Sequence, residues 1–145
     1  MFVNKIPFIT IISRHIKFAT VETNQKRKKL HLSESIKNVI AIYTQRGFKV
    51  EHALLDQEFV RLRTELLNMG VHANFATRNK HVPEIERQHR VIKERALACR
   101  STLPFVVLPK LLLIKMANNY ALCINMFPPR GGISNVSPRT LMTVI

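Results

Sequence analysis

Two acidic residues stand where an α/β protein can place catalytic groups. Asp56 follows a strand-like apolar run, residues 48–55, and Glu86 lies near the start of a segment with helical periodicity. Open α/β sheets bind their ligands at the carboxyl ends of strands, which makes Asp56 a candidate catalytic residue. The alternative is a turn or capping role, the more common use of a lone Asp after a strand.

The segment that contains Glu86 has a charged face and an apolar face. Glu86, Arg90 and Lys93 are spaced i, i+4 and i+7, so a helix presents them on one side. Such a helix can pack on a sheet and offer a carboxylate beside two cations that bind phosphates. The alternative is a surface helix whose Glu86–Arg90 pair adds about 0.2–0.5 kcal/mol. The neighbouring apolar positions are Ile85, Ile92, Ala96 and Cys99.

Strand and helix patterns alternate along the chain. We expect a hairpin of strands at 2–3 and 6–12 around Asn4-Lys5, and further strands at 16–21, 48–55 and 71–75. Ser33 is the predicted cap of a helix that ends at Gly47, and a second helix, 59–69, ends at Gly70. Longer helices are expected at 82–100 and 109–125. The order predicts a mixed α/β domain without internal repeats.

The charge balance favours a polyanionic partner. The 145 residues contain 23 Lys and Arg against 9 Asp and Glu, a formal charge of +14, and Lys26-Arg27-Lys28-Lys29 forms a basic loop. This field attracts nucleic acid, although mitochondrial and ribosomal proteins share such a balance. The acid-free first 21 residues also fit a mitochondrial presequence, but their β-branched run favours a strand. No membrane span is expected, and the presence of only two cysteines, Cys99 and Cys123, without metal-ligand spacing indicates a reducing compartment.

Several motifs together resemble copia-type retrotransposon integrases. The run Glu86-Arg87-Gln88-His89-Arg90 resembles the Glu-Arg-x-Asn-Arg segment that opens the catalytic helix of that family, with His89 in place of Asn. Similar motifs occur in the family's order over nearly the whole chain. They are Leu54-Leu55-Asp56-Gln57-Glu58-Phe59, Gly70-Val71, Val82-Pro83, Pro128-Pro129 and Ser137-Pro138-Arg139-Thr140.

The resemblance implies an RNase H-like fold, a mixed sheet of about five strands flanked by helices. In such integrases two Asp and one Glu hold two Mg²⁺ or Mn²⁺ ions, which support DNA 3′-end processing and strand transfer. Asp56 and Glu86 match two of these catalytic metal ligands. The implied nucleic-acid residues are Lys80, Arg87, Arg90 and Lys93. The expected partners are element and target DNA and further copies of the chain, in the nucleus or a cytoplasmic particle.

The chain departs from the family pattern at its first strand. No acid precedes Glu22, so we expect a core at residues 1–127 that lacks the start of that strand, followed by an extension at 128–145. Only 29 residues separate Asp56 from Glu86, fewer than in retroviral relatives, and Glu84 competes with Glu86. We therefore expect DNA binding but little or no strand transfer by this chain. The remaining alternatives are a catalytically dead DNA-binding remnant and an unrelated basic protein of mitochondrial or ribosomal type.

Overall fold

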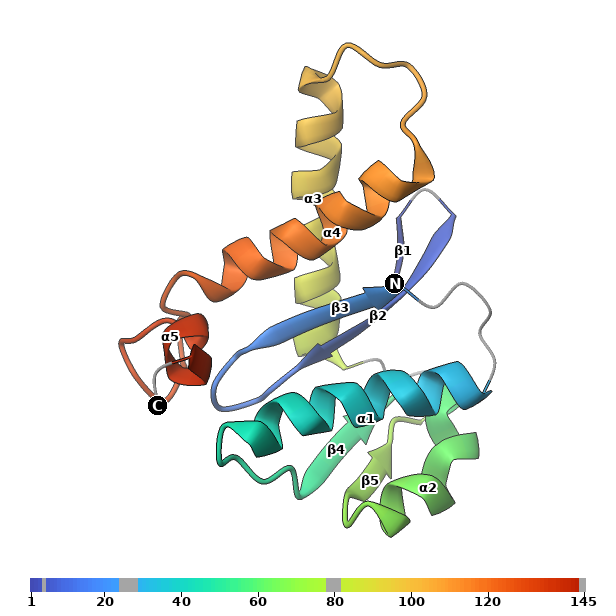
Figure 1. Cartoon of the computed structure of the whole chain (residues 1–145), viewed down its shortest axis with the longest axis vertical. Coiled ribbons are helices and arrows are strands. Elements are labelled where there is room, and N and C mark those ends of the chain that lie inside the picture. Colours follow the sequence, from blue (N-terminus) through green and yellow to red (C-terminus); the bar gives the residue numbers. More distant parts are fainter. Residues whose placement is uncertain (4, 24–28, 78–81, 144–145) are drawn as a thin grey trace. The chain divides into compact units, whose positions relative to one another are not determined.

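The chain divides into two compact units. The computed structural model describes residues 1–3, 5–23, 29–77 and 82–143 (Figure 1). Unit 1 combines Met1–Gln25 with Arg87–Ile145, and unit 2 is Lys26–Glu86. The predicted division into residues 1–127 and 128–145 stays a prediction.

An antiparallel sheet of three strands forms the N-terminal part of unit 1. Its strands are β1 (Phe2–Val3), β2 (Ile6–Ile12) and β3 (Ala19–Thr23), in the order β1-β2-β3. The predicted β1–β2 hairpin is confirmed, but β3 begins three residues later than expected. Residues 13–18 form a closed turn instead, in which Lys17 has φ 60° and its N–H donates to the Ser13 carbonyl at 3.0 Å.

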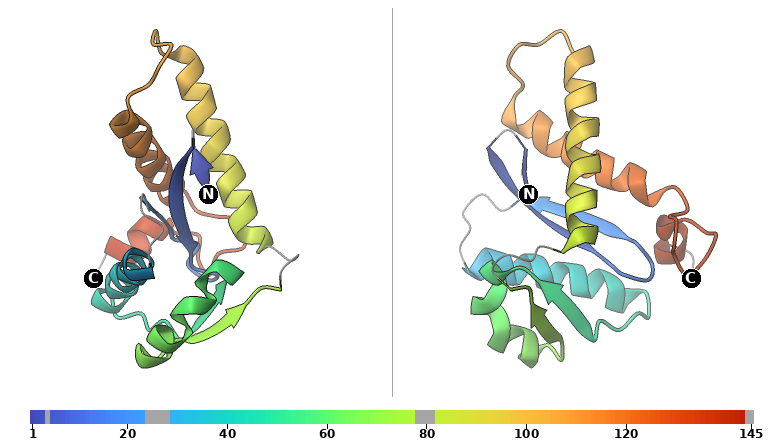
Figure 2. Two further views of the ribbon diagram at one scale, coloured as in Figure 1. Left: turned by 90° about the vertical axis from the view of Figure 1, so that its right-hand side faces the viewer. Right: turned by 180° about the vertical axis from the view of Figure 1, so that it is seen from behind.

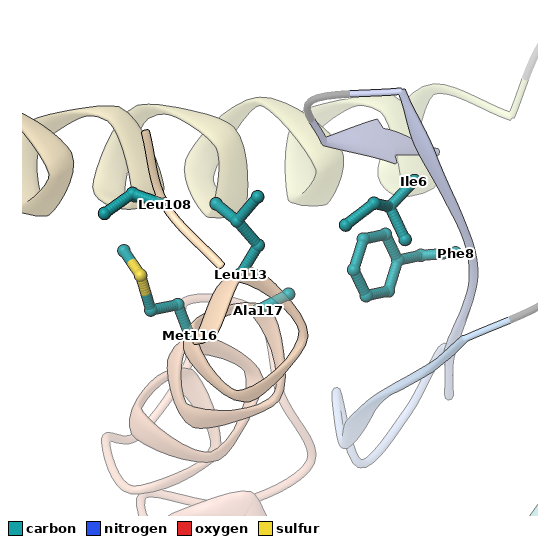
Figure 3. Close-up of a cluster of buried hydrophobic side chains, with 6 residues drawn as sticks. All are labelled: Ile6, Phe8, Leu108, Leu113, Met116 and Ala117. Carbon is teal, nitrogen blue, oxygen red and sulfur yellow. The ribbon is translucent and has the colours of Figure 1, made fainter. Parts of the chain in front are cut away.

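Helices of unit 1 cover both faces of this sheet. They are α3 (Pro83–Thr102, in unit 1 from Arg87 onward), α4 (Lys110–Asn125) and the short α5 (Pro138–Thr143). Figure 2 shows the three strands between α3 and α4. One face of α4 packs with β2 into a cluster of buried side chains, and its other face exposes Leu111 and Leu122. The cluster contains Ile6, Phe8, Leu108, Leu113, Met116 and Ala117 (Figure 3).

A buried amide joins the end of α4 to the start of β3. Asn125, only 1% exposed, donates from Nδ2 to the Ala19 carbonyl at 2.7 Å, and its Oδ1 accepts the Ala19 N–H at 2.8 Å. The same side chain thus satisfies both backbone groups of one residue. Because unsatisfied buried backbone groups are costly, this pair of hydrogen bonds fixes how α4 lies on the sheet.

Unit 2 is built around two parallel strands. They are β4 (His52–Leu55) and β5 (His72–Phe75), paired in register from His52 with His72 to Leu55 with Phe75. Between them run the 3₁₀ helix η1 (Gln57–Leu62) and α2 (Arg63–Asn68), and α1 (Lys29–Gln45) precedes them. Gly47 and Gly70 have φ values of 75° and 74°, as predicted for residues that end helices.

The predicted cap of α1 was wrong. The described helix begins at Lys29, one turn before Ser33, and Ser33 is buried within it. Its hydroxyl hydrogen-bonds the Glu65 carboxylate, which also contacts Lys29 Nζ at 3.0 Å. The Ser33 hydrogen bond, followed by that of Lys29, lowers the pKa of Glu65. Ser33 is suited to a helix cap, but its side chain instead binds Glu65, a residue distant in the sequence, so local sequence alone does not predict this contact.

The five predicted strands are confirmed, but the single mixed sheet is not. Among the described residues, hydrogen bonds join the strands as one sheet of three and one of two. Strand patterns reveal which residues are extended, whereas sheet membership depends on pairing between distant segments, which those patterns leave open. Strand β4 is also shorter than the predicted 48–55. No helix in the described part of the chain is long and apolar enough to cross a membrane.

Candidate active site and nucleic-acid surface

Asp56 lies directly after β4, at the carboxyl end of the parallel pair. Its backbone is extended (φ −69°, ψ 160°), and its carbonyl accepts the Phe59 N–H at 3.0 Å as η1 begins. The side chain makes no capping hydrogen bond to η1. Beside it, the Ala76 N–H donates to the Leu55 carbonyl at 2.8 Å, so β4 and β5 end together. The half-buried Asp56 side chain therefore does not cap η1, which was the structural alternative to a catalytic role.

Glu86 occupies the first turn of α3, as the sequence predicted. Its N–H donates to the Val82 carbonyl at 3.1 Å, and its side chain is exposed, whereas Glu84 in the same turn is half-buried. Acids in this turn also interact favourably with the helix dipole, which gives both glutamates a structural role. Glu86 and Asp56 belong to the same unit. Their assignment as metal ligands stays a prediction.

The donor set does not fit a site for two metal ions. In the described ranges no group of three or more His, Cys, Asp or Glu side chains is arranged to hold a metal. Asp56 and Glu86 supply the oxygen ligands that Mg²⁺ prefers, but residues 1–21, which include β1 and β2, contain no acid. Two carboxylates neutralise only half of the charge of two divalent ions. We therefore derive no reaction step through a metal.

The exposed face of α3 is cationic. Arg87, Arg90 and Lys93 are exposed, while Ile92 on the opposite side is 0% exposed. The predicted division of this helix into a charged and an apolar face is confirmed. Arg100 extends the stripe, because it is exposed and lies seven residues after Lys93. The same i, i+7 spacing in the sequence would have identified Arg100. We call Arg90, Lys93 and Arg100 the α3 cation stripe.

Lys80, a predicted nucleic-acid residue, and most of the predicted basic loop lie outside the described residues. Lys80 lies outside the described residues, as do three members of the basic tetrad, Lys26, Arg27 and Lys28. The fourth member, Lys29, is the first residue of α1 and contacts Glu65. Lys29 is therefore in helix rather than in the predicted loop.

His89 is the residue that stands at the Asn position of the integrase motif. It is partly buried on α3, and burial, followed by the N-terminal amino group and Lys93, lowers its pKa to about 4. The imidazole is consequently neutral at neutral pH. Its charge then matches that of the Asn it replaces, so this departure from the motif adds no positive charge to the helix.

The fold is similar to that of solved integrase cores. No protein-family model and no curated protein sequence matches the chain. The catalytic core domain of BIV integrase is 18% identical and superposes with a TM-score of 0.66, over 96% of this chain and 86% of that one. The catalytic core of HTLV-2 integrase, solved with magnesium in a trimeric form, is 13% identical with a TM-score of 0.70, over 97% and 88%. The fold of the chain is therefore similar to that of retroviral integrase catalytic core domains.

Proposed function

We propose that this chain is the core module of a copia-type retrotransposon integrase and that it binds DNA through α3. The observation that carries the proposal is the exposed α3 cation stripe, which follows directly on Glu86 in a chain with the integrase-core fold. Phosphate contacts dominate the affinity of proteins for DNA and need only accessible cations. The fold likeness gives no support to an unrelated basic protein.

Catalysis by the 145 residues is not part of the proposal. The HTLV-2 core was solved with magnesium, which supports the use of a divalent ion by this fold. Asp56 and Glu86 alone do not fit two such ions. In a longer polypeptide that supplies a third carboxylate, we propose that the module uses Mg²⁺ or Mn²⁺ for DNA 3′-end processing and strand transfer, with Asp56 and Glu86 as ligands.

Fluorescence anisotropy with a short labelled duplex tests the binding proposal. If about six phosphates are contacted, affinity falls by roughly 10³ or more between about 50 and 200 mM salt. We expect similar affinities for unrelated duplex sequences. Absence of binding at low salt would refute the proposal. A nicking and joining assay with Mg²⁺ or Mn²⁺ should give no product, and any metal-stimulated product would overturn the inactive assignment.

Self-association belongs to the same proposal. The HTLV-2 core was solved as a trimeric form, and α4 of this chain exposes Leu111, 66% accessible, and Leu122, 55% accessible. Exposed apolar side chains on one helix favour contact with another copy. Sedimentation of the chain at increasing concentration would show the association, and a monomer at all concentrations would contradict it. The nucleus or a cytoplasmic particle is the proposed location.

A further inference from the structure

Two histidines face each other at the start of the parallel strands in unit 2. His52 opens β4 and His72 opens β5, and their Cα atoms are register partners. Their ring centroids are 5.5 Å apart and their planes differ by 32°. Both side chains are exposed. The pairing of the strands therefore places two accessible imidazoles next to each other.

This separation matches two imidazoles that share one metal ion. Zn²⁺ binds histidine nitrogen at about 2.0–2.1 Å in tetrahedral geometry, which places the centroids of two such rings about 5 Å apart. Imidazole also suits Cu²⁺ and Ni²⁺, whereas Mg²⁺ prefers oxygen ligands. The 5.5 Å between the ring centroids is thus close to the separation that chelation of one transition-metal ion by both imidazoles requires.

The backbone holds the two histidines side by side. The His72 N–H donates to the Glu51 carbonyl at 2.8 Å, directly beside His52. The parallel ladder then continues to Leu55 and Phe75, so neither strand can shift without losing several hydrogen bonds. Because the backbone of both ligands is already fixed, binding an ion costs mainly side-chain entropy, which favours chelation.

Space for further ligands lies beside His72. An open hollow of about 310 Å³ is lined by Arg63, Leu67, His72, Ala73 and Asn74. The hollow borders His72 but not His52, and because both imidazoles are exposed, solvent water can complete the coordination sphere of an ion that they share. The Arg63 guanidinium also lines this hollow and lies 5.0 Å from the Phe75 ring centroid, so its positive charge is engaged over that ring.

We propose that His52 and His72 form a binding site for a transition-metal ion of the Zn²⁺ class. The site lies at the opposite end of β4 from Asp56, about 13 Å along the strand at 3.3 Å per residue. The imidazole nitrogens lie at the start of the parallel strands β4 and β5, whereas the Asp56 carboxylate lies at their end. Zn²⁺ binding at the histidines is therefore separable from any Mg²⁺ binding at Asp56.

Calorimetric titration of the full 145-residue chain with zinc chloride tests the site. We expect one Zn²⁺ per chain and, for His52→Ala and His72→Ala separately, an affinity at least about tenfold lower, since even indirect perturbation of metal ligands costs about 10–100-fold. His31→Ala is the matched control in unit 2, because His31 lies on α1 and contacts Glu34 at 3.9 Å. Its Zn²⁺ affinity should equal that of the unaltered chain.

Two further measurements separate the proposed site from other histidines. Co²⁺ bound to the unaltered chain should show the visible absorption of tetrahedral coordination, and the double variant His52→Ala with His72→Ala should lose it. An equal concentration of Mg²⁺ should not displace Zn²⁺. Unchanged Zn²⁺ binding in the double variant, or displacement by Mg²⁺, would overturn the proposal. Circular dichroism of the variants checks that the exposed substitutions leave the fold intact.

Discussion

The two units of the chain differ sharply in charge. Unit 1 contains twelve Lys and Arg but only two acids, Glu22 and Glu94, for a formal charge of +10. Unit 2 contains eleven Lys and Arg and seven acids, for a formal charge of +4. The stronger field for phosphates therefore belongs to unit 1, whereas both candidate metal ligands, Asp56 and Glu86, belong to unit 2.

This difference shows how nucleic-acid binding can persist without metal chemistry. The α3 cation stripe does not depend on bound metal, since Lys and Arg keep their charge at neutral pH. A two-ion site requires several carboxylates at one place, and loss of a single ligand weakens it as a whole. We therefore expect the proposed affinity for DNA to be more robust than any binding of two metal ions.

The largest expected effect comes from removing the α3 cation stripe. The triple variant Arg90→Gln, Lys93→Gln, Arg100→Gln should bind DNA on the order of 10²–10³-fold more weakly at about 0.1 M salt. A plot of log affinity against log salt has a negative slope, and each lost phosphate contact makes this slope shallower by about 0.9, hence by about 2.7 for three contacts. Anisotropy titrations at several salt concentrations measure both quantities.

The matched control removes three exposed cations of unit 2. Lys37→Gln, Arg46→Gln, Lys49→Gln changes the net charge by the same amount but leaves α3 intact. We expect a much smaller loss of affinity and an almost unchanged salt slope. Equal losses in the two triple variants would show that net charge, rather than the placement of cations on α3, governs binding.

The next largest effect concerns stability and the buried side-chain amide of Asn125 in unit 1. Asn125→Ala leaves the N–H and the carbonyl of Ala19 without these partners, and each unsatisfied buried group costs about 1–3 kcal/mol. We expect the free energy of unfolding to fall by about 2–4 kcal/mol in urea titrations. Asn119→Ala, exposed on the same helix, should change it by less than about 0.5 kcal/mol.

Amide hydrogen exchange tests whether unit 1 and unit 2 unfold separately. If the units unfold separately, Asn125→Ala should speed exchange in β2 and β3 and leave the amides of β4 and β5 unchanged. Faster exchange in all four strands would instead show one cooperative unit.

The sequence predicted well those features that depend on local patterns. The helices α3 and α4 follow apolar spacing, and Gly47 and Gly70 sit where a helix end requires positive φ. Asp56 and Glu86 were located correctly on their elements, because a strand end and a helix start are local properties. The functional roles of these two acids remain a prediction.

The features that the sequence did not predict depend on distant contacts. Asn125 bonds Ala19 across 106 residues, and no local signal distinguishes it from the exposed Asn119. Ser33 is a residue type that often caps helices, but its side chain contacts Glu65 instead. The division into two sheets and the facing pair of His52 and His72 follow from strand pairing, which residue patterns leave open.

A smaller effect should appear in how the free energy of unfolding depends on pH, through His89 in unit 1. The pKa of His89 is lowered to about 4 chiefly by burial, whereas an unfolded His titrates near about 6.5. The unfolded state therefore binds more protons between these values, so the contribution of His89 is complete above about pH 6.5 and is lost as the pH falls toward about 4. Urea titrations across this range should show a shallower decline for His89→Gln than for the unaltered chain.

The control for His89 is His31→Gln in unit 2. His31 is partly exposed beside Glu34, and its replacement should leave the decline with pH unchanged. Because His89 keeps part of its surface in water, solvent reduces the expected difference. A decline in His89→Gln as steep as in the unaltered chain would assign the pH dependence to other groups.

The smallest expected effect tests whether the acids of unit 2 take part in binding. The double variant Asp56→Asn, Glu86→Gln should bind DNA with an affinity within about threefold of the unaltered chain, slightly tighter because two negative charges are removed. Added Mg²⁺ at constant ionic strength should affect both proteins equally, since the two carboxylates do not fit a two-ion site. If Mg²⁺ tightened binding only in the unaltered chain, Asp56 and Glu86 would hold a metal that contacts DNA. This result would contradict the proposal that unit 1 binds DNA phosphates independently of the two acids of unit 2.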